Sequence, residues 1–323
     1  MRNLFPALPN SRQLVSSGTL SALIQLKRQD LFTGLMEVMY PNESRAILLF
    51  NLGSPFALFL MDEAIAYKIH PDEWGDVFAR QNGSASLLTL SGDGLRACLL
   101  VLEGGAETEE EVTLRPDRMD AYLAEVTSDS AISLLTAQAR SFWGVMILPG
   151  NNLPVQDALT FTDKGVFSDP RGLFNFAPSG DQLIRMTRRT FRDMPVSLHE
   201  YALRVTFLSL AQAALERFEQ LAGDRLVDSL GFEINNFTYH QGWKIQFFGK
   251  RLLHQEFFPS VEEAAQVYRS LFRQMGSYMQ RVTGATLVAG ILTEGLGALP
   301  ASYRALYENQ NMILTSEAIH ASR

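Results

Sequence analysis

Residues 31–52 read LFTGLMEVMY PNES RAILLFNL, and this stretch decides how the first part of the chain folds. Residues 31–40 and 45–52 are rich in strand-forming side chains, and Pro41-Asn42-Glu43-Ser44 between them has the composition of a turn. The stretch therefore predicts an antiparallel hairpin. A helix is predicted before it, because Ser17-Gly18-Thr19 can begin one and apolar residues then recur at helical spacing, at Leu20, Leu23, Ile24 and Leu26.

Strand and helix signals continue to alternate up to residue 105. Residues 56–61 are predicted to form a third strand, residues 71–81 a helix and residues 85–90 a short strand. Residues 94–102 are a nearly continuous apolar run that fits a helix or a buried strand, and we favour the helix. Residues 103–117 combine a double glycine with five glutamates, which favours a solvated connector between domains.

A second helix-and-hairpin pattern follows the connector. Residues 120–140 are predicted to be helical, residues 145–148 and 157–161 to be strands, and Pro149-Gly150-Asn151-Asn152 to be a turn. Gly34 and Gly53 of the first pattern lie 19 positions apart, and Gly144 and Gly165 of the second lie 21 apart. The two patterns are thus a candidate tandem pair, which duplication and convergent helix–hairpin patterning explain equally well.

Long helical patterns replace this alternation after a loop-rich stretch at 166–196. Ser197-x-x-Glu200 is a capping box that begins a helix running to about residue 222, and Ser260-x-x-Glu263 begins a second long helix. Gly231 is expected to break the stretch between them. Alternating apolar residues at 243–247 and a turn at Gly249 predict a hairpin over 242–258, and further helices are predicted at 285–296 and 301–307.

The predicted fold class is therefore α+β. The N-terminal part consists of helix-plus-antiparallel-hairpin units, and the C-terminal part is mainly helical with one hairpin. The expected domains are 1–105, 106–196 with its long loop, and 197–323, which agrees with the length of 323 residues.

Composition excludes several classes of function. The net charge of −7 and the pI of about 5.3 disfavour binding to nucleic acid, because such a surface repels phosphate. No histidine pairs with another at i, i+3 or i+4, and the lone Cys98 lies in an apolar run, so neither a metal nor another cofactor is expected. The N-terminus lacks the pattern of a signal peptide and no apolar run is long enough to span a bilayer, so a cytoplasmic protein without membrane contact is expected.

One basic cluster is a candidate partner-binding site. Arg185, Arg188, Arg189 and Arg192 fall on one face if residues 185–192 are helical. Such a face can bind an acidic partner, phosphate or nucleic acid. Ion pairing with the protein's own acidic residues, such as those at 107–111, is the favoured alternative.

The first unit resembles the PATAN domain of bacterial signalling proteins. The resemblance rests on Leu20-Ser21-Ala22-Leu23-Ile24, on Thr33-Gly34 opening the first strand, and on Phe50-Asn51-Leu52-Gly53 closing the second, with Ala57 after it. It covers residues 14–65, and Ser54-Pro55-Phe56 departs from the short aliphatic lead that is usual in the family. The resemblance implies protein–protein interaction in response-regulator or motility control, and it implies no catalytic residues.

These observations predict a non-enzymatic adaptor or regulatory subunit of a bacterial signalling or assembly system. Its expected partners are proteins, among them two-component or motility components, and a homodimer is a further expectation because the long apolar helices need a partner surface. The alternative is an enzyme whose site assembles around the loop at 166–196. Its first candidate residues are Phe167, Asp169, Arg171, Asp181 and Arg185.

Overall fold

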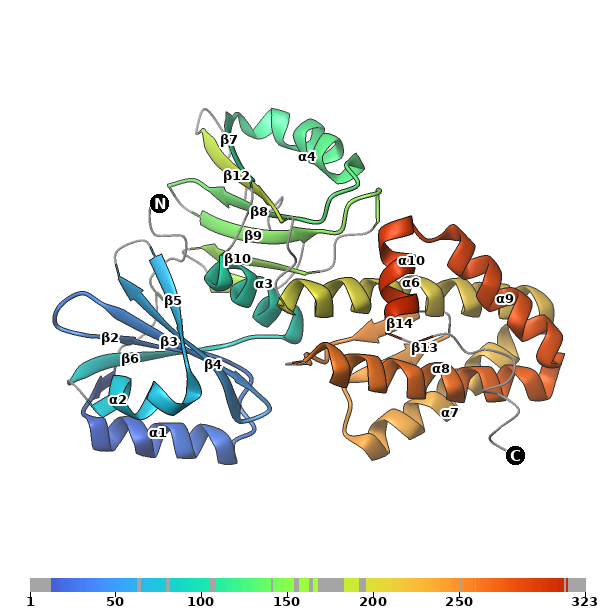
Figure 1. Ribbon diagram of the computed structural model, residues 1–323, viewed down its shortest axis with the longest axis horizontal. Helices are drawn as coiled ribbons and strands as arrows, with labels where there is room; N and C mark the ends of the chain where they lie inside the picture. Colours follow the sequence, from blue (N-terminus) through green and yellow to red (C-terminus); the bar gives the residue numbers. More distant parts are fainter. Residues whose placement is uncertain are drawn as a thin grey trace. The chain divides into compact units, whose positions relative to one another are not determined.

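The chain forms two compact units, residues 1–195 and 196–323 (Figure 1). The computed structural model describes residues 13–62, 65–79, 82–104, 108–140, 142–153, 157–162, 165–167, 183–191, 196–249, 251–258, 260–310 and 312.

The first unit begins with a six-stranded antiparallel sheet, sheet A, in the order β1-β6-β2-β3-β4-β5. Its strands are β1 (Gln13–Val15), β2 (Gly34–Met39), β3 (Arg45–Asn51), β4 (Ser54–Asp62), β5 (Ile65–Ile69) and β6 (Gly83–Thr89). Helices α1 (Ser17–Gln29) and α2 (Trp74–Ala79), the latter preceded by the 3-10 turn η1 (Pro71–Glu73), pack on one face of this sheet. Helix α3 (Gly92–Glu103) follows β6.

A second six-stranded antiparallel sheet, sheet B, has the order β11-β10-β9-β8-β12-β7. Its strands are β7 (Thr108–Leu114), β8 (Ser133–Gln138), β9 (Phe142–Leu148), β10 (Ala158–Thr162), β11 (Gly165–Phe167) and β12 (Ile184–Thr190). The 3-10 turn η2 (Pro116–Arg118) and helix α4 (Met119–Ser128) follow β7, and α4 packs on one face of the sheet.

The two sheets have the same plan, residue by residue. Reading sheet B from its other edge gives β7-β12-β8-β9-β10-β11, which is the order of sheet A with six added to each strand number. Cross-strand pairs correspond as well: Leu48↔Leu58 matches Met146↔Ala158, and Val38↔Ala85 matches Ala137↔Met186. Matched positions thus lie 98 to 101 residues apart, and each matched pair faces the helix-covered side of its sheet.

Helix α3 contacts both sheets, through β3 and β5 of sheet A and through β9 and β10 of sheet B. All its residues from Gly94 to Leu102 are buried, so the helix has no solvent-facing side over this length. A helix that is covered all round belongs to the interior of a domain. The apolar run at 94–102 is thus the shared core of the first unit.

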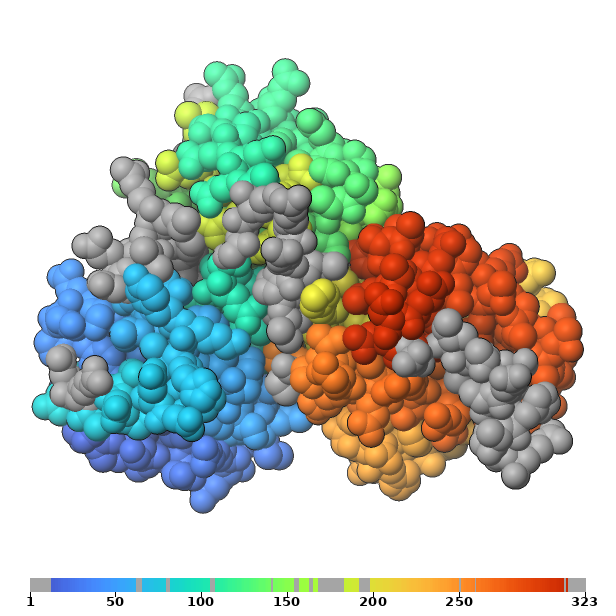
Figure 2. Space-filling model, viewed as in Figure 1, coloured from blue at the N-terminus to red at the C-terminus, as the bar shows by residue number. Residues whose placement is uncertain are grey.

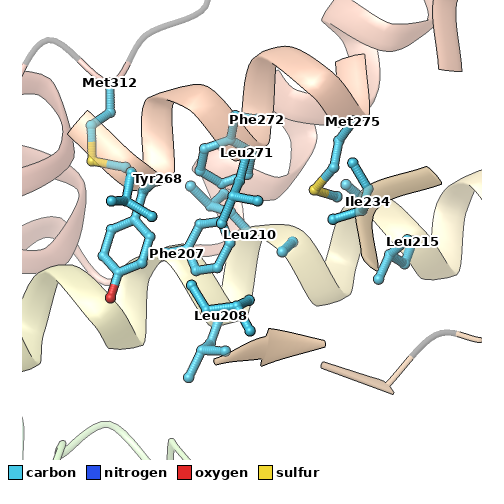
Figure 3. Packing of buried hydrophobic residues seen from close by; sticks show 14 of the residues in the cluster. Phe207, Leu208, Leu210, Leu215, Ile234, Tyr268, Leu271, Phe272, Met275 and Met312 are labelled. Atoms are coloured by element: carbon cyan, nitrogen blue, oxygen red, sulfur yellow. The ribbon is translucent and has the colours of Figure 1, made fainter. Parts of the chain in front are cut away.

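The second unit is helical apart from one hairpin. Its elements are α6 (Val196–Ala222), α7 (Asp224–Gln241), β13 (Ile245–Phe248), β14 (Arg251–His254), α8 (Val261–Thr283), α9 (Ala285–Ala298) and α10 (Ala301–Asn309). Its core packs α6 against α8. Phe207 of α6 stacks on Tyr268 with ring centroids 4.4 Å apart, and Phe272 meets the Phe207 ring edge-on (Figure 3). In the space-filling view, α8, α9 and α10 form much of the visible face of this unit (Figure 2).

The predicted α+β class is confirmed, with antiparallel sheets first and a helical region with one hairpin last. The quoted hairpin forms as β2 and β3, and residues 94–102 are helical. Ser260 caps α8 at its N-terminus, since the Glu263 N–H donates to Ser260 Oγ at 3.2 Å.

Four local predictions are wrong. Residues 133–138 form strand β8 rather than the end of a helix, so Gly34 corresponds to Ser133 and not to Gly144. The expected connector contains strand β7, and the expected loop contains β12. Helix α7 runs through Gly231, which is buried against Phe247 instead of breaking the helix.

The motif residues of the quoted stretch hold the corner where β2 begins and β3 ends. Thr33 Oγ1 accepts a hydrogen bond from the Leu52 N–H at 3.0 Å, and the Gly53 N–H donates to the Phe32 carbonyl at 2.8 Å. Gly34 has φ +151, and a Cβ atom there would lie 2.0 Å from the Leu88 carbonyl oxygen of β6. Only glycine fits this close approach of two strands.

We expect Gly34→Ala to lower the free energy of unfolding by at least about 3 kcal/mol, because it adds an overlap and backbone strain. Gly18→Ala is the matched control, since a Cβ there meets nothing within 4 Å and lies in α1. The control should keep or slightly raise stability. Urea denaturation of both variants measures this, and equal stabilities would contradict the constraint at Gly34.

Candidate functional site

The basic cluster lies on a strand and not on a helix. Arg185, Arg188 and Arg189 belong to β12, so Arg185 and Arg189 share one face and Arg188 lies on the other. Arg185 Nε pairs with Glu111 at 2.7 Å, and Arg189 Nε pairs with Glu109 at 3.0 Å, both on the adjacent strand β7. These are the protein's own acidic residues, as the favoured alternative expected. Arg192 lies outside the described residues.

Arg188 binds a different carboxylate, on the side of sheet B that α4 covers. Its Nη2 donates to Asp129 Oδ2 at 2.5 Å, just after the end of α4. This hydrogen bond, together with the Ala131 N–H that donates to the same carboxylate, holds the pKa of Asp129 below its usual value. The three described arginines thus bind strands and a helix end of their own unit.

The residues of the enzymatic alternative do not converge where the structure describes them. Phe167 lies on β11 and Arg185 on β12, which are separated in sheet B by β10, β9 and β8. At about 4.8 Å per strand, the two positions are roughly 19 Å apart. Asp169, Arg171 and Asp181 lie outside the described residues.

Other reactive groups are buried or scattered. Cys98 is fully buried in α3, and burial raises the pKa of its thiol, so the thiol stays protonated and shielded. Over the described part of the chain, no group of three or more His, Cys, Asp or Glu side chains could hold a metal ion. Within the same residues, no helix is long and apolar enough to cross a membrane.

A buried polar network joins α6, β14 and α8 in the helical unit. Arg204 donates from Nε to His254 Nδ1 at 3.4 Å and from Nη2 to the His254 carbonyl at 3.0 Å. Because arginine can only donate, Nδ1 must present its lone pair, and the neutral ring then carries its proton on Nε2. Nε2–H donates to the Tyr268 oxygen at 2.9 Å. All three side chains are at most 3% exposed, so this network orders the core and is out of reach of a ligand.

Helix α7 is fixed in rotation by its contact with the hairpin. Val227, Leu230 and Ile234 bury one side of the helix in the core. The Asn235 side chain grips the backbone of β13, since its Oδ1 accepts from the Phe247 N–H at 2.6 Å and its Nδ2 donates to the Phe247 carbonyl at 2.7 Å. Gly242 ends the helix in a left-handed conformation at φ 72.

In this orientation of α7, two aromatic side chains point into solvent. Phe232 is 77% exposed and Tyr239 is 79% exposed, seven residues or two helical turns apart, with Asn236 exposed between them. We call Phe232, Asn236 and Tyr239 the α7 face. In Figures 1 and 2, α7 lies at the lower margin of the helical unit.

The α7 face was not predicted from the sequence. A signal for it exists, because Val227, Leu230 and Ile234 follow the i, i+3, i+7 spacing of a buried stripe. Phe232 and Tyr239 fall opposite that stripe, where solvent is expected. Two aromatic residues on the solvent side of one helix are therefore the candidate functional site.

No protein-family model matches this chain, and no curated protein matches its sequence.

The carboxylate of Asp129 should make stability depend on pH. Its folded pKa lies below the unfolded value of about 3.9, so its contribution is present above that value and is lost as pH falls through the folded pKa. We expect Asp129→Asn to cost about 1 kcal/mol or less at pH 7, because the carboxylate is 43% exposed. The difference from the parent should vanish once the pH lies below the folded pKa of Asp129. Urea titrations at several pH values measure this, with Asp76→Asn on the exposed side of α2 as control; a pH-independent difference would contradict the ion pair.

The buried network predicts that replacing His254 lowers the free energy of unfolding much more than replacing the exposed His240. His254→Phe keeps a ring but removes both nitrogens, so Arg204 and Tyr268 each lose a partner and unfolding free energy should fall by about 2–5 kcal/mol. His240→Phe, at an exposed site in α7, should change it by less than about 0.5 kcal/mol. Denaturation followed by circular dichroism compares the two, and similar losses would argue against the network.

Proposed function

We propose that the protein is a non-enzymatic adaptor or regulatory subunit of a bacterial signalling or assembly system, acting in the cytoplasm by binding other proteins through the α7 face. The observation that carries this proposal is the pair of exposed rings, Phe232 and Tyr239, on one side of a helix whose other side is anchored in the core. An amphipathic helix that presents anchors two turns apart suits a partner's apolar groove.

The chemistry of these residues supports the proposal. Aromatic side chains bring a large contact area at low cost in conformational entropy, and tyrosine is enriched among residues that dominate binding energy. The Asn235 clamp on the Phe247 backbone holds α7 in place before any partner binds. A rigid surface loses little freedom on association.

The expected partner class follows from the resemblance of residues 14–65 to a signalling module, so two-component or motility proteins are the first to test. Nucleic acid is not proposed, because the described arginines of the basic cluster are engaged by Glu109, Glu111 and Asp129.

We expect the Phe232→Ala/Tyr239→Ala double variant to fold normally and to bind its partner at least about tenfold more weakly, since exposed positions affect folding little and aromatic anchors affect binding strongly. The measurement is affinity capture from the native host, followed by titration of the purified partner against both proteins. Tyr67→Ala is the control, because this tyrosine of β5 is half exposed but lies in the other unit. A partner that binds the double variant as tightly as the parent protein would refute the role of the α7 face.

A further inference from the structure

The hairpin of β13 and β14 has one face in the core of the helical unit and one face in solvent. Ile245, Phe247 and His254 are buried, and side chains alternate between the two faces along each strand. The Gln255 N–H donates to the Lys244 carbonyl at 2.9 Å, which extends the ladder by one step and places Lys244 in the same register. We call the outward side chains the hairpin face: Lys244, Gln246, Phe248, Arg251, Leu253 and Gln255.

The hairpin face combines an apolar centre with positive charge at both ends. Phe248 is 59% exposed and Leu253 is 43% exposed, and they are diagonal neighbours because Phe248 pairs with Arg251. Lys244 and Arg251 are four ladder steps apart, which is about 14 Å along the hairpin. Within the part of the chain that the structure describes, neither cation forms an ion pair.

Two carboxylates close to the hairpin lie off this face. Glu256 is only 4% exposed and accepts the Lys244 N–H at 2.8 Å from the buried side. Asp228 belongs to α7, and its Oδ1 would lie 3.6 Å from a Cβ atom at Gly249 in the turn. The hairpin face itself therefore carries two positive charges and no negative one, in a chain whose net charge is −7.

We propose that the hairpin face binds an extended, acidic segment of a partner protein, as a second binding site beside the α7 face. Side chains of an extended segment recur on one side at every second residue, so acidic residues at i and i+4 are about 14 Å apart. This is the spacing of Lys244 and Arg251, and the apolar residue at i+2 then lies over Phe248 and Leu253. An α-helix fits less well, because residues about nine positions apart span this length and point to opposite sides.

The charge of the whole chain favours a short segment over a larger polyanion. A nucleic acid or an anionic membrane extends past the hairpin face and meets the surrounding surface, whose net charge is negative. A segment of about five extended residues ends within the face, so its two carboxylates lie at the two cations. Charge complementarity of this kind determines which partner binds.

Titration of the full chain with synthetic peptides tests this proposal. The probe is a labelled peptide with two glutamates four positions apart and a leucine midway, and the control peptide carries lysines in place of the glutamates. Fluorescence anisotropy is measured at low salt, because exposed ion pairs weaken as salt rises. We expect the acidic peptide to bind the parent protein with a Kd of about 1 mM or below, and at least about tenfold more tightly than the basic peptide.

The Lys244→Glu/Arg251→Glu variant should reverse this preference, because both contacts change sign. Both side chains are exposed, so the fold should persist, and binding of the basic peptide by the variant verifies it. Arg115→Glu/Arg118→Glu is the matched control, since it makes the same change in net charge at exposed sites of the first unit. The control variant should keep the preference of the parent protein.

Two results would overturn the proposal: equal binding of both peptides by the parent protein, or a preference that the control variant loses as fully as the hairpin variant. Vesicles of equimolar phosphatidylcholine and phosphatidylserine are a second probe. If the parent protein binds the vesicles through Lys244 and Arg251 and does not bind the acidic peptide, the site is a membrane contact and the proposal is wrong. None of these measurements involves Phe232 or Tyr239, so the proposed role of the α7 face keeps its own, separate test.

Discussion

The first unit depends on one buried ion pair at the centre of α3. Arg96 is fully buried, and its Nη1 lies 3.1 Å from Asp157 Oδ1, beside strand β10, and 3.2 Å from Asp93 Oδ1 in its own helix. Separating buried opposite charges is costly, so the pair favours the observed placement of α3 against sheet B. Because α3 also contacts β3 and β5, this placement joins the two halves of the unit.

The separation in sequence between interacting residues explains which parts of this fold could be predicted from the sequence. Strands β2 and β3, and the capped helix α8, are specified by signals within about ten residues, and these predictions hold. Strands β7 and β12 are different, because Glu109 and Glu111 of β7 pair with Arg189 and Arg185 of β12, more than 70 positions away. Residues 185, 188 and 189 fit a helix face equally well until that distant strand is known. Local periodicity carries no information about such pairing.

The candidate site was missed for a related reason. Exposure of Phe232 depends on which side of α7 the hairpin covers, and Gly231 reads locally as a helix breaker. In the folded unit, Gly231 packs against Phe247 and Asn235 clamps the backbone of the same residue. The contact with Phe247 keeps the helix continuous at Gly231 and also fixes Phe232 on the solvent side. A prediction that ends the helix at Gly231 therefore does not place Phe232 and Tyr239 on one face.

The exposed side chains of sheet B and of helix α7 differ, and this contrast bears on where binding occurs. Sheet B pairs Arg185 and Arg189 with glutamates of the neighbouring strand, and charged side chains along an edge strand discourage pairing with another chain. Helix α7 instead leaves Phe232 and Tyr239 in water, where no described contact of the fold requires them. Rings that are more than three-quarters exposed bury little apolar area in the helical unit, so they contribute little to its stability. Binding to another protein is the role that we propose for them.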